Sequence, residues 1–392
     1  MAQQFEVERR PVIVSFDESA IYTETYGFAG TSGTVFLEGQ RLIPKGEPRD
    51  AVILFMHPSS TLQLMPLPMA LAGAGIHVLC AASRYAKNDT AAIIEKVVID
   101  QGAYVRHAKQ ELGYKTVILG GWSGGGSLAL FYQSQAENPT ITATPAGDPV
   151  DLTKAELMPA DAVTLLAAHV SRAVTLTEWM DPSVKDETDP DDREVELDLY
   201  DPANPNQPPY DPDYLARFRD AQIARNRRIT AWVFEMLETL KKRGTAELER
   251  AFVVHRTMAD PRWLDATLEP NDRKANWCYL GNPETVNVGP VGLGRFNTLR
   301  SWLSQWSYDE SRANGEACAK LISAPTMVIE NSADDAAPSS HASRLFNAVA
   351  SVDKEHHVIQ GATHYYRNQP EQLAKAVATI GGWMRDRGYR HG

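Results

Sequence analysis

The stretch Gly121-Trp122-Ser123-Gly124-Gly125 decides how we interpret this sequence. It lies between the run 115–119, which predicts a buried strand, and the segment 127–136, which predicts a helix. A serine flanked by glycines between a strand and a helix is typical of a nucleophile elbow, a turn so tight that side chains at the flanking positions would collide with neighbouring backbone. We therefore expect the hydroxyl of Ser123 to be exposed at the edge of a sheet as a candidate nucleophile.

Strands and helices alternate around this turn. Short apolar runs at 51–56 and 76–80 predict two more buried strands, and helical spacing occurs at 65–74 and 91–112. This alternation predicts an α/β fold with a mostly parallel central sheet flanked by helices. Sheets of this kind place their active sites at the carboxyl ends of the strands.

The same alternation returns near the end of the chain. Strands are predicted at 326–330 and 356–359, and helices at 340–350 and 371–386. A further core strand is predicted at 162–168, before the character of the sequence changes. The two halves of the alternating pattern are therefore expected to join in one sheet.

A serine nucleophile needs a general base, and the base needs an acid that orients it. Both follow predicted strands in the chain order serine, acid, histidine. His364 lies in the glycine-containing loop after 356–359, and an acidic pair follows 326–330. We expect His364 to be the base, and we favour Asp334 over Asp335 as the acid because adjacent side chains point in different directions.

Two backbone N–H groups should hold the negative charge that develops on a substrate oxygen. Gly124, directly after the nucleophile, is expected to supply the first. The second should come from the loop after the first buried strand, where Pro58 has no N–H to donate. We therefore expect Ser59 to donate, with Ser60 as the alternative. We expect His57 to brace the loop by a hydrogen bond, and a catalytic role for it is the less favoured alternative.

The segment 169–318 predicts a large, mainly helical cap inserted between two parts of the core, 1–168 and 319–392. Its first part, 179–214, is rich in Asp, Glu and Pro, which predicts irregular structure. A long amphipathic helix is then expected to begin at the capping residue Asp211 and to end at a basic cluster followed by glycine.

Aromatic side chains are concentrated in this predicted cap. Large aromatic side chains build pockets with a few polar groups, and they also fill cores. We expect Trp302 and Trp306, on one stripe of a helix predicted at 297–306, to contact the substrate together with Trp122 and His169. The alternative is that the tryptophans only pack the cap against the core.

Composition disfavours several classes of partner. The 39 Lys and Arg residues against 50 Asp and Glu give a formal charge of −11, which disfavours nucleic acids and anionic membranes. Three scattered cysteines form no metal-binding or disulfide pattern, and the acidic cluster 186–192 lacks the spacing of a calcium loop. We expect a cytoplasmic protein that binds a small molecule and needs no metal or cofactor. The sequence leaves the oligomeric state open, a homo-oligomer included.

These motifs together resemble the α/β-hydrolase superfamily over about 51–168 and 319–392. Two positions depart from its pattern, because Pro58 and Asn331 stand where many members have glycine. The motifs that carry the resemblance are Gly121-Trp122-Ser123-Gly124-Gly125, the turn 334–338, Gly361-Ala362-Thr363-His364 and the loop at His57-Pro58.

The resemblance implies a serine hydrolase that cleaves a carboxylic ester or lactone of a bulky hydrophobic small molecule, aromatic or alicyclic. The same three residues would also suit an amidase, a carbon–carbon bond hydrolase or an acyltransferase. A ligand receptor that keeps the fold without catalysis is the alternative outside the enzymes. Branches with a carboxylate nucleophile, such as epoxide hydrolases, are disfavoured because the candidate nucleophile is the serine at 123.

Overall fold

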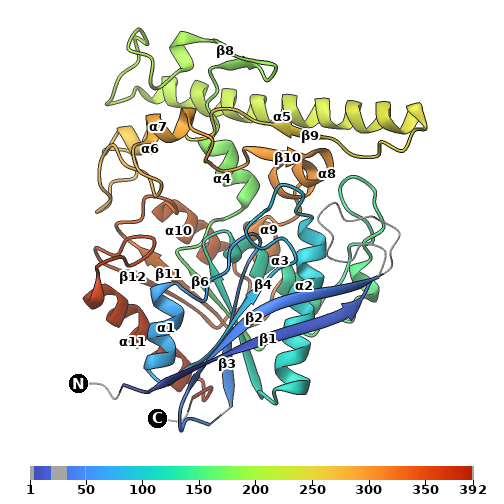
Figure 1. Ribbon diagram of the computed structural model, residues 1–392. Coiled ribbons are helices and arrows are strands. Elements are labelled where there is room, and N and C mark those ends of the chain that lie inside the picture. The colour runs from blue at the N-terminus through green and yellow to red at the C-terminus, as the bar shows by residue number, and fades with distance from the viewer. Residues whose placement is uncertain (1–3, 19–32, 49, 391–392) are drawn as a thin grey trace.

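A computed structural model of the chain describes residues 4–18, 33–48 and 50–390. In this part of the chain, eight strands form one central sheet that is parallel except for an N-terminal antiparallel hairpin (Figure 1). In spatial order the strands are β1 (Val7–Asp17), β2 (Thr34–Pro44), β4 (His77–Ala82), β3 (Ala51–His57), β5 (Thr116–Trp122), β6 (Ala162–Leu166), β11 (Thr326–Asn331) and β12 (Lys354–Ile359).

Helices cover both faces of the sheet. Every residue of β3 is buried, and alternate side chains of a strand point to opposite faces. Leu54 and Met56 therefore belong to one apolar cluster, whereas Ile53 and Phe55 belong to the other. On the first side lie α2 (Ile94–Arg106), its π-helical continuation η1 (His107–Glu111), α3 (Gly125–Glu137), the short η2 (Leu152–Lys154), α9 (Gly315–Ala319) and α10 (Ser339–Ala348), and on the second α1 (Pro66–Gly73) and α11 (Pro370–Asp386).

The predicted strands from β3 to β12 and the helices between them are present, and the mostly parallel α/β sheet is confirmed. The sequence analysis did not predict β1 and β2. Their apolar side chains alternate with exposed ones, and Ile13 is largely exposed although Val12 and Val14 beside it are buried. This pattern of an edge hairpin is weaker than the continuous apolar runs of the central strands.

Apart from α9, the chain between β6 and β11 forms a further layer above the sheet (Figure 1). β6 and β11 are nevertheless parallel neighbours in the sheet, with Thr326 paired to Val163. The boundaries 169–318 for a separate cap domain stay a prediction. The elements of this layer are α4 (Arg172–Trp179), β7 (Val184–Asp186), β8 (Asp189–Arg193), η3 (Val195–Leu197), α5 (Pro212–Arg243), β9 (Ala251–Val253), α6 (Pro261–Leu264), α7 (Pro283–Val288), β10 (Phe296–Thr298), α8 (Leu299–Ser301) and the π-helical η4 (Trp302–Trp306).

The long helix of this layer begins and ends as its sequence predicts. The side chain of Asp211 accepts a hydrogen bond from the N–H of Asp213, and Gly244 ends α5 in the left-handed conformation with φ of 61°. The sequence analysis predicted irregular structure for the acidic stretch before α5, but part of this stretch is ordered. β7 and β8 form a small hairpin, and in its turn the side chain of Asp186 accepts a hydrogen bond from the N–H of Thr188. In the described ranges, no helix combines the length and apolarity needed to cross a bilayer.

Candidate active site

The turn between β5 and α3 holds Ser123 in a strained conformation. Its φ is 55°, in the left-handed region that residues other than glycine rarely adopt. The glycines around it are needed for space: a Cβ on Gly125 would overlap the carbonyl oxygen of Met56, and one on Gly126 would overlap the side chain of Ala168. The sequence folds here into the predicted elbow, and the serine side chain lies in a cavity at the carboxyl ends of the strands.

Three side chains from distant loops meet at this point. The hydroxyl of Ser123 donates a hydrogen bond to Nε2 of His364 over 3.1 Å. Nδ1 of the same imidazole donates to Oδ2 of Asp334 over 2.8 Å. All three side chains are buried. The structure therefore brings together the three residues that the sequence analysis selected, in the geometry that activates a serine.

The two adjacent acids, Asp334 and Asp335, make different contacts. Oδ1 of Asp334 accepts hydrogen bonds of 2.8 Å from the N–H groups of both Ala336 and Ala337, which fixes the carboxylate toward the imidazole. Asp335 has its backbone carbonyl, rather than its carboxylate, bonded to the indole N–H of Trp263. Burial, and then the charge of Asp334, raise the pKa of Asp335 to about 6.

Asn331 links the loop of the acid to the loop of the histidine. Its amide donates to the carbonyl oxygen of Thr363 over 3.0 Å, and its side-chain oxygen accepts from the hydroxyl of Tyr366 over 2.7 Å. These bonds require an amide side chain, so the departure from glycine at this position braces the two loops against each other.

The backbone N–H groups in the loop after β3 do not point where a second oxyanion donor was expected to point. The N–H groups of Ser59 and Ser60 both point to Nδ1 of His57, each over 3.2 Å. An N–H engaged by the imidazole is not directed at a substrate oxygen, so neither serine is placed as the sequence analysis predicted. Gly124, at the start of α3, keeps the expected position next to the nucleophile, where helix N–H groups lack partners within the helix.

The side chain of His57, rather than the backbone of its loop, offers an N–H donor for the oxyanion. Burial first, and then the nearby charges of Arg172 and His364, lower the pKa of His57 well below its usual range, so the ring is neutral. Because Nδ1 accepts two hydrogen bonds, the proton of the neutral ring lies on Nε2. A Cβ built on Gly124 would lie 3.0 Å from this Nε2. The Nε2–H group therefore faces the space beside Gly124.

A cavity of about 160 Å³ opens onto these groups. Its walls come from the strand ends on one side and from the layer between β6 and β11 on the other. The lining mixes aromatic rings with histidine, serine and charged side chains, which is more polar than the hydrophobic pocket expected from the sequence. The lining residues are His57, Ser59, Ser60, Asp89, Trp122, Ser123, Gly124, His169, Arg172, Thr175, Trp179, Tyr279, Leu293, Ala336, His364 and Tyr365.

Two of the four residues expected to touch substrate line this cavity. Trp122 does so while its indole N–H donates to the carbonyl oxygen of His364 over 3.3 Å. The imidazole of His169 also lines the cavity, and its buried Nδ1 has no hydrogen-bond partner among the described residues. Trp302 and Trp306 do not line it. They are fully buried in an apolar cluster of the upper layer, which is the packing role that the sequence analysis gave as the alternative to substrate contact.

The sequence analysis missed three residues that line the cavity. Arg172 and Tyr279 come from the upper layer and Asp89 from the loop between β4 and α2, and none of them lies in a recognisable motif. Arg172 had one local signal: it is the first Lys, Arg, Asp or Glu after β6. Nothing in the sequence indicates that Asp89 and Tyr279 meet it.

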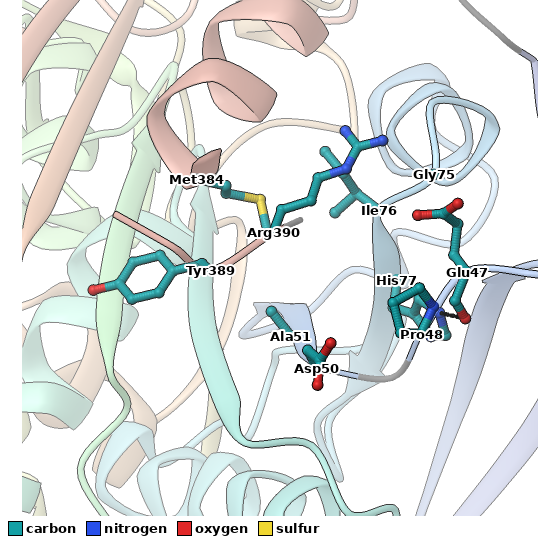
Figure 2. Close-up of a pocket in the computed structure, with 10 residues that line it drawn as sticks. All are labelled: Glu47, Pro48, Asp50, Ala51, Gly75, Ile76, His77, Met384, Tyr389 and Arg390. Carbon is teal, nitrogen blue, oxygen red and sulfur yellow. Dashed lines mark hydrogen bonds between the residues drawn. The ribbon is translucent and has the colours of Figure 1, made fainter. Parts of the chain in front are cut away.

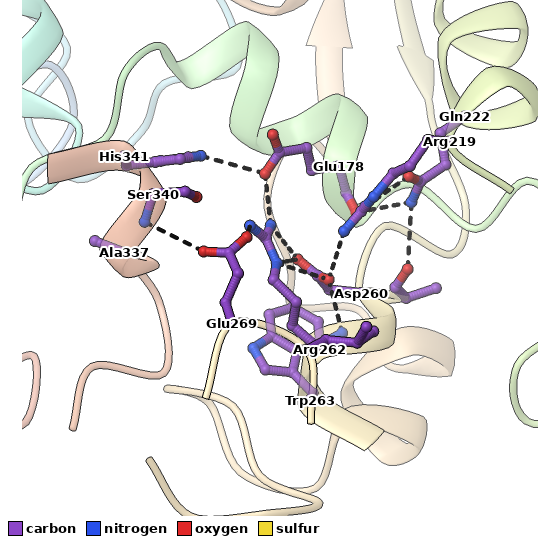
Figure 3. A network of polar contacts seen from close by, with 12 residues as sticks. Glu178, Arg219, Gln222, Asp260, Arg262, Trp263, Glu269, Ala337, Ser340 and His341 are labelled. Atoms are coloured by element: carbon purple, nitrogen blue, oxygen red, sulfur yellow. Dashed lines mark hydrogen bonds and ion pairs between the residues drawn. The ribbon is translucent and has the colours of Figure 1, made fainter. Parts of the chain in front are cut away.

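A network of ion pairs fixes this wall to the core (Figure 3). Glu178, at the end of α4, accepts from Arg262 over 2.5 Å and lies 3.2 Å from Nε2 of His341 in α10. Although burial opposes it, the charges of Arg262 and His341 lower the pKa of Glu178 well below its usual range. Arg262 also pairs with Asp260 and Glu269. These contacts fix the position of α4, and therefore of the cavity wall that it forms, relative to the sheet.

A second, much smaller cavity of about 20 Å³ lies at the opposite edge of the sheet (Figure 2). Ala51 and His77 line it, and they are the first residues of β3 and β4. It is thus at the amino ends of the strands, away from the elbow. In the described ranges, no group of three or more His, Cys, Asp or Glu side chains could hold a metal ion.

Neither protein-family models nor curated protein sequences match the chain. Solved structures do resemble it at low identity. The structure of DcsB in complex with its substrate analogue has a TM-score of 0.51 at 11% identity, covering 97% of this chain and 98% of that one. The α/β hydrolase GrgF from Penicillium sp. sh18 has 0.49 at 12%, covering 96% and 98%. The monoacylglycerol lipase of Paleococcus ferrophilus has 0.44 at 15%, covering 89% and 98%.

The strand order, the elbow after β5, the acid after β11 and the histidine after β12 form one consistent arrangement. Parallel strands with helices on both faces place all three loops at the same edge of the sheet. The chain has the α/β-hydrolase fold.

Proposed function

We propose that the protein is a serine hydrolase that cleaves a carboxylic ester or lactone through an acyl-enzyme on Ser123. The observation that carries the proposal is the continuous chain of hydrogen bonds from the Ser123 hydroxyl through His364 to the carboxylate of Asp334. The strained φ of 55° at the serine supports the same role, because such strain is found where a residue must be held for chemistry.

In the first step, Nε2 of His364 takes the proton of Ser123 while Oγ bonds to the carbonyl carbon of the substrate. The carbonyl electron pair moves onto oxygen, and the N–H of Gly124 and the Nε2–H of His57 donate to that oxyanion. The tetrahedral intermediate then collapses, the bond to the leaving oxygen breaks, and His364 returns the proton to it. Asp334 stabilises the imidazolium in between.

In the second step, a water molecule replaces the leaving group. His364 takes a proton from the water as its oxygen bonds to the acyl carbon, and the second tetrahedral intermediate expels Oγ of Ser123, which regains a proton from the imidazole. The products are a carboxylic acid and an alcohol, or a hydroxy acid from a lactone. We propose a small-molecule substrate with a ring that packs against Trp122, Trp179 and Tyr279 in the cavity wall.

Labelling with a fluorophosphonate tests the proposal, because an activated serine reacts with it and a receptor on the same fold need not. We expect one covalent adduct, located at Ser123 by mass spectrometry, and hydrolysis of aryl esters or lactones. Ser123→Ala should remove labelling and lower turnover by about 10⁴-fold or more with an unchanged circular dichroism spectrum. Retained hydrolysis in this variant would refute the proposal.

The nearest alternatives differ in the bond or the acceptor. A screen of esters, lactones, amides and β-diketones, each with and without an added alcohol, separates ester hydrolysis from amide hydrolysis, carbon–carbon cleavage and acyl transfer. The cytoplasmic location remains a proposal that rests on the three scattered cysteines, Cys80, Cys278 and Cys318, which are free and buried.

A further inference from the structure

Arg172 is a charged side chain buried beside the nucleophile. It is the first residue of α4, whose start is capped by the side chain of Ser171. Its guanidinium lies over the ring of Trp306 at 4.3 Å, so the aromatic face supports it from one side. A Cβ built on Gly124 would lie 3.3 Å from its Nη1. The guanidinium of Arg172 therefore packs on Trp306 with one face, and its Nη1 lies near the position expected for the scissile carbonyl.

Most hydrogen-bond donors of the Arg172 guanidinium have no acceptor among the residues that the structure describes. A guanidinium carries five N–H donors. Among the described residues, the carboxylate of Asp89 accepts from Nη2 of Arg172, whereas the buried Nε has no acceptor. Leaving a buried charge with a single partner is costly. A second anion bonded to Nη1, the nitrogen that lies beside Gly124, would relieve part of that cost.

Another buried arginine in the same layer shows what a purely structural role looks like. Arg225 in α5 is fully buried, and all three of its nitrogens donate. Its partners include both carboxylate oxygens of Glu187 and the carbonyl oxygen of Asp181. Arg225 does not line the cavity. The contrast indicates that Arg172 is kept incompletely paired where a ligand can reach it.

The electrostatic surroundings point the same way. Burial lowers the pKa of Arg172, and the carboxylate of Asp89 opposes that effect. Besides His364, the cavity is lined by His57 and His169. Burial lowers the pKa of both imidazoles well below the usual range, so neither carries a positive charge that would compete with Arg172 for an anion.

We infer that Arg172 forms a subsite for a carboxylate, and that the substrate is an ester or lactone that carries a carboxylate a short spacer away from the carbonyl attacked by Ser123. The inference rests on the proposed function for the identity of the reacting carbonyl. It replaces the wholly hydrophobic substrate expected from the sequence with an amphiphilic one, whose apolar part contacts the aromatic rings and whose anionic part pairs with the free edge of the guanidinium.

The test uses monomethyl and dimethyl esters of malonate, succinate and glutarate as matched anionic and neutral probes. Binding is measured by calorimetry on the Ser123→Ala protein, which cannot turn them over. We expect at least one monoester to bind about 10-fold more tightly or better than its diester. Adding Arg172→Met should remove this preference, and Arg172→Lys should retain part of it, because a point charge remains without the planar fork.

Two further variants control for net charge and for folding. Arg227→Met removes a charge from the exposed pair of Arg227 with Asp309 and should leave the preference intact. Asp89→Asn removes the competing carboxylate and should strengthen the preference several-fold, a gain that a merely structural Arg172 would not give. Equal binding of monoesters and diesters, or a preference that survives Arg172→Met, would overturn the subsite.

The binding arm separates this inference from the proposed function. A protein that reacts with fluorophosphonate and hydrolyses neutral esters but shows no preference for monoesters keeps its proposed function and loses the subsite. In the protein that retains Ser123, Arg172→Met should lower kcat/KM about 100-fold for the preferred monoester and only slightly for its diester. An equal loss for both esters would assign Arg172 to general support of the site and overturn the subsite.

Discussion

The two walls of the cavity are built by different means. On the sheet side, Asp334 and His364 follow the adjacent strands β11 and β12, and Ser123 follows β5, which only β6 separates from β11. The parallel strands therefore bring the three loops together. On the other side, Arg172 and Tyr279 come from a layer whose position depends on ion pairs and buried aromatic rings. The difference teaches that the candidate catalytic residues are placed by turns at the ends of the strands, whereas the opposite wall of the cavity is placed by side-chain contacts between distant segments.

The sharpest way to test the sheet side is to change the two adjacent acids. Asp334→Asn should lower kcat by about 10⁴-fold, because an amide cannot stabilise the imidazolium and favours the wrong tautomer of His364. The variant should fold normally, since an amide oxygen can still accept from the N–H groups of Ala336 and Ala337. Steady-state kinetics on an aryl ester provides the measurement.

Asp335→Asn is the matched control, and it should keep kcat within a few-fold. It also carries a pH signature. The pKa of Asp335 is about 6 in the fold against about 3.9 in an unfolded chain, so the native state binds more protons between these values and loses stability as pH rises through that window. The amide has no such loss. Urea unfolding should show Asp335→Asn to be more stable than wild type by about 1–3 kcal/mol at pH 7, with little difference at pH 4. A large loss of activity in this control would reverse the assignment of the acid.

Replacing His57 tests whether an imidazole completes the oxyanion site. His57→Phe removes the Nε2–H donor and should lower kcat by about 10²–10³-fold with a smaller change in KM. Ser59→Ala and Ser60→Ala keep the backbone N–H groups and should leave kcat nearly unchanged. If His57→Phe retained full kcat, the second donor would have to be one of the serine N–H groups after a rearrangement of the loop.

The smallest effect on catalysis is expected where the sequence suggested substrate contact. Trp302→Phe removes an indole N–H that donates to Oγ1 of Thr230 over 2.9 Å, far from solvent. We expect the free energy of unfolding to fall by about 1–3 kcal/mol, because the buried hydroxyl oxygen of Thr230 loses the hydrogen bond that it accepts, although the hydroxyl still donates to Ser307. KM should stay unchanged. A rise in KM without a loss of stability would return this tryptophan to the substrate-binding wall.

The acid illustrates how far local sequence can be taken. The order of strands, elbow, acidic turn and histidine loop narrowed the acid to two adjacent residues, and the preference for Asp334 agrees with its hydrogen bond to His364. The loop at His57 shows where that reasoning fails. The sequence indicated a donor among Ser59 and Ser60, but the direction of an N–H depends on the conformation of the loop, and here the imidazole engages both.

The aromatic residues of the upper layer show a second feature that local sequence does not determine, which is the partner against which an apolar face packs. The stripe containing Trp302 and Trp306 predicted an apolar surface correctly, but periodicity does not say what that surface faces. Trp306 turns out to support Arg172 from behind instead of touching the cavity. An amphipathic pattern fixes which side is buried, and the partner that buries it is chosen by the packing of the whole layer.

The sequence by itself determined the α/β sheet, the elbow and the residues that meet at the strand ends, because continuous apolar runs and glycines at a forced turn act over a few neighbouring residues. The tertiary structure alone decided the tautomer of His57, the exposure of the Arg172 edge and the mixed character of the cavity. The tautomer follows from the exact conformation of the loop at His57, and the Arg172 edge and the cavity lining follow from contacts between distant segments, such as Arg172 with Asp89. No local sequence pattern records either the loop conformation or the long-range packing.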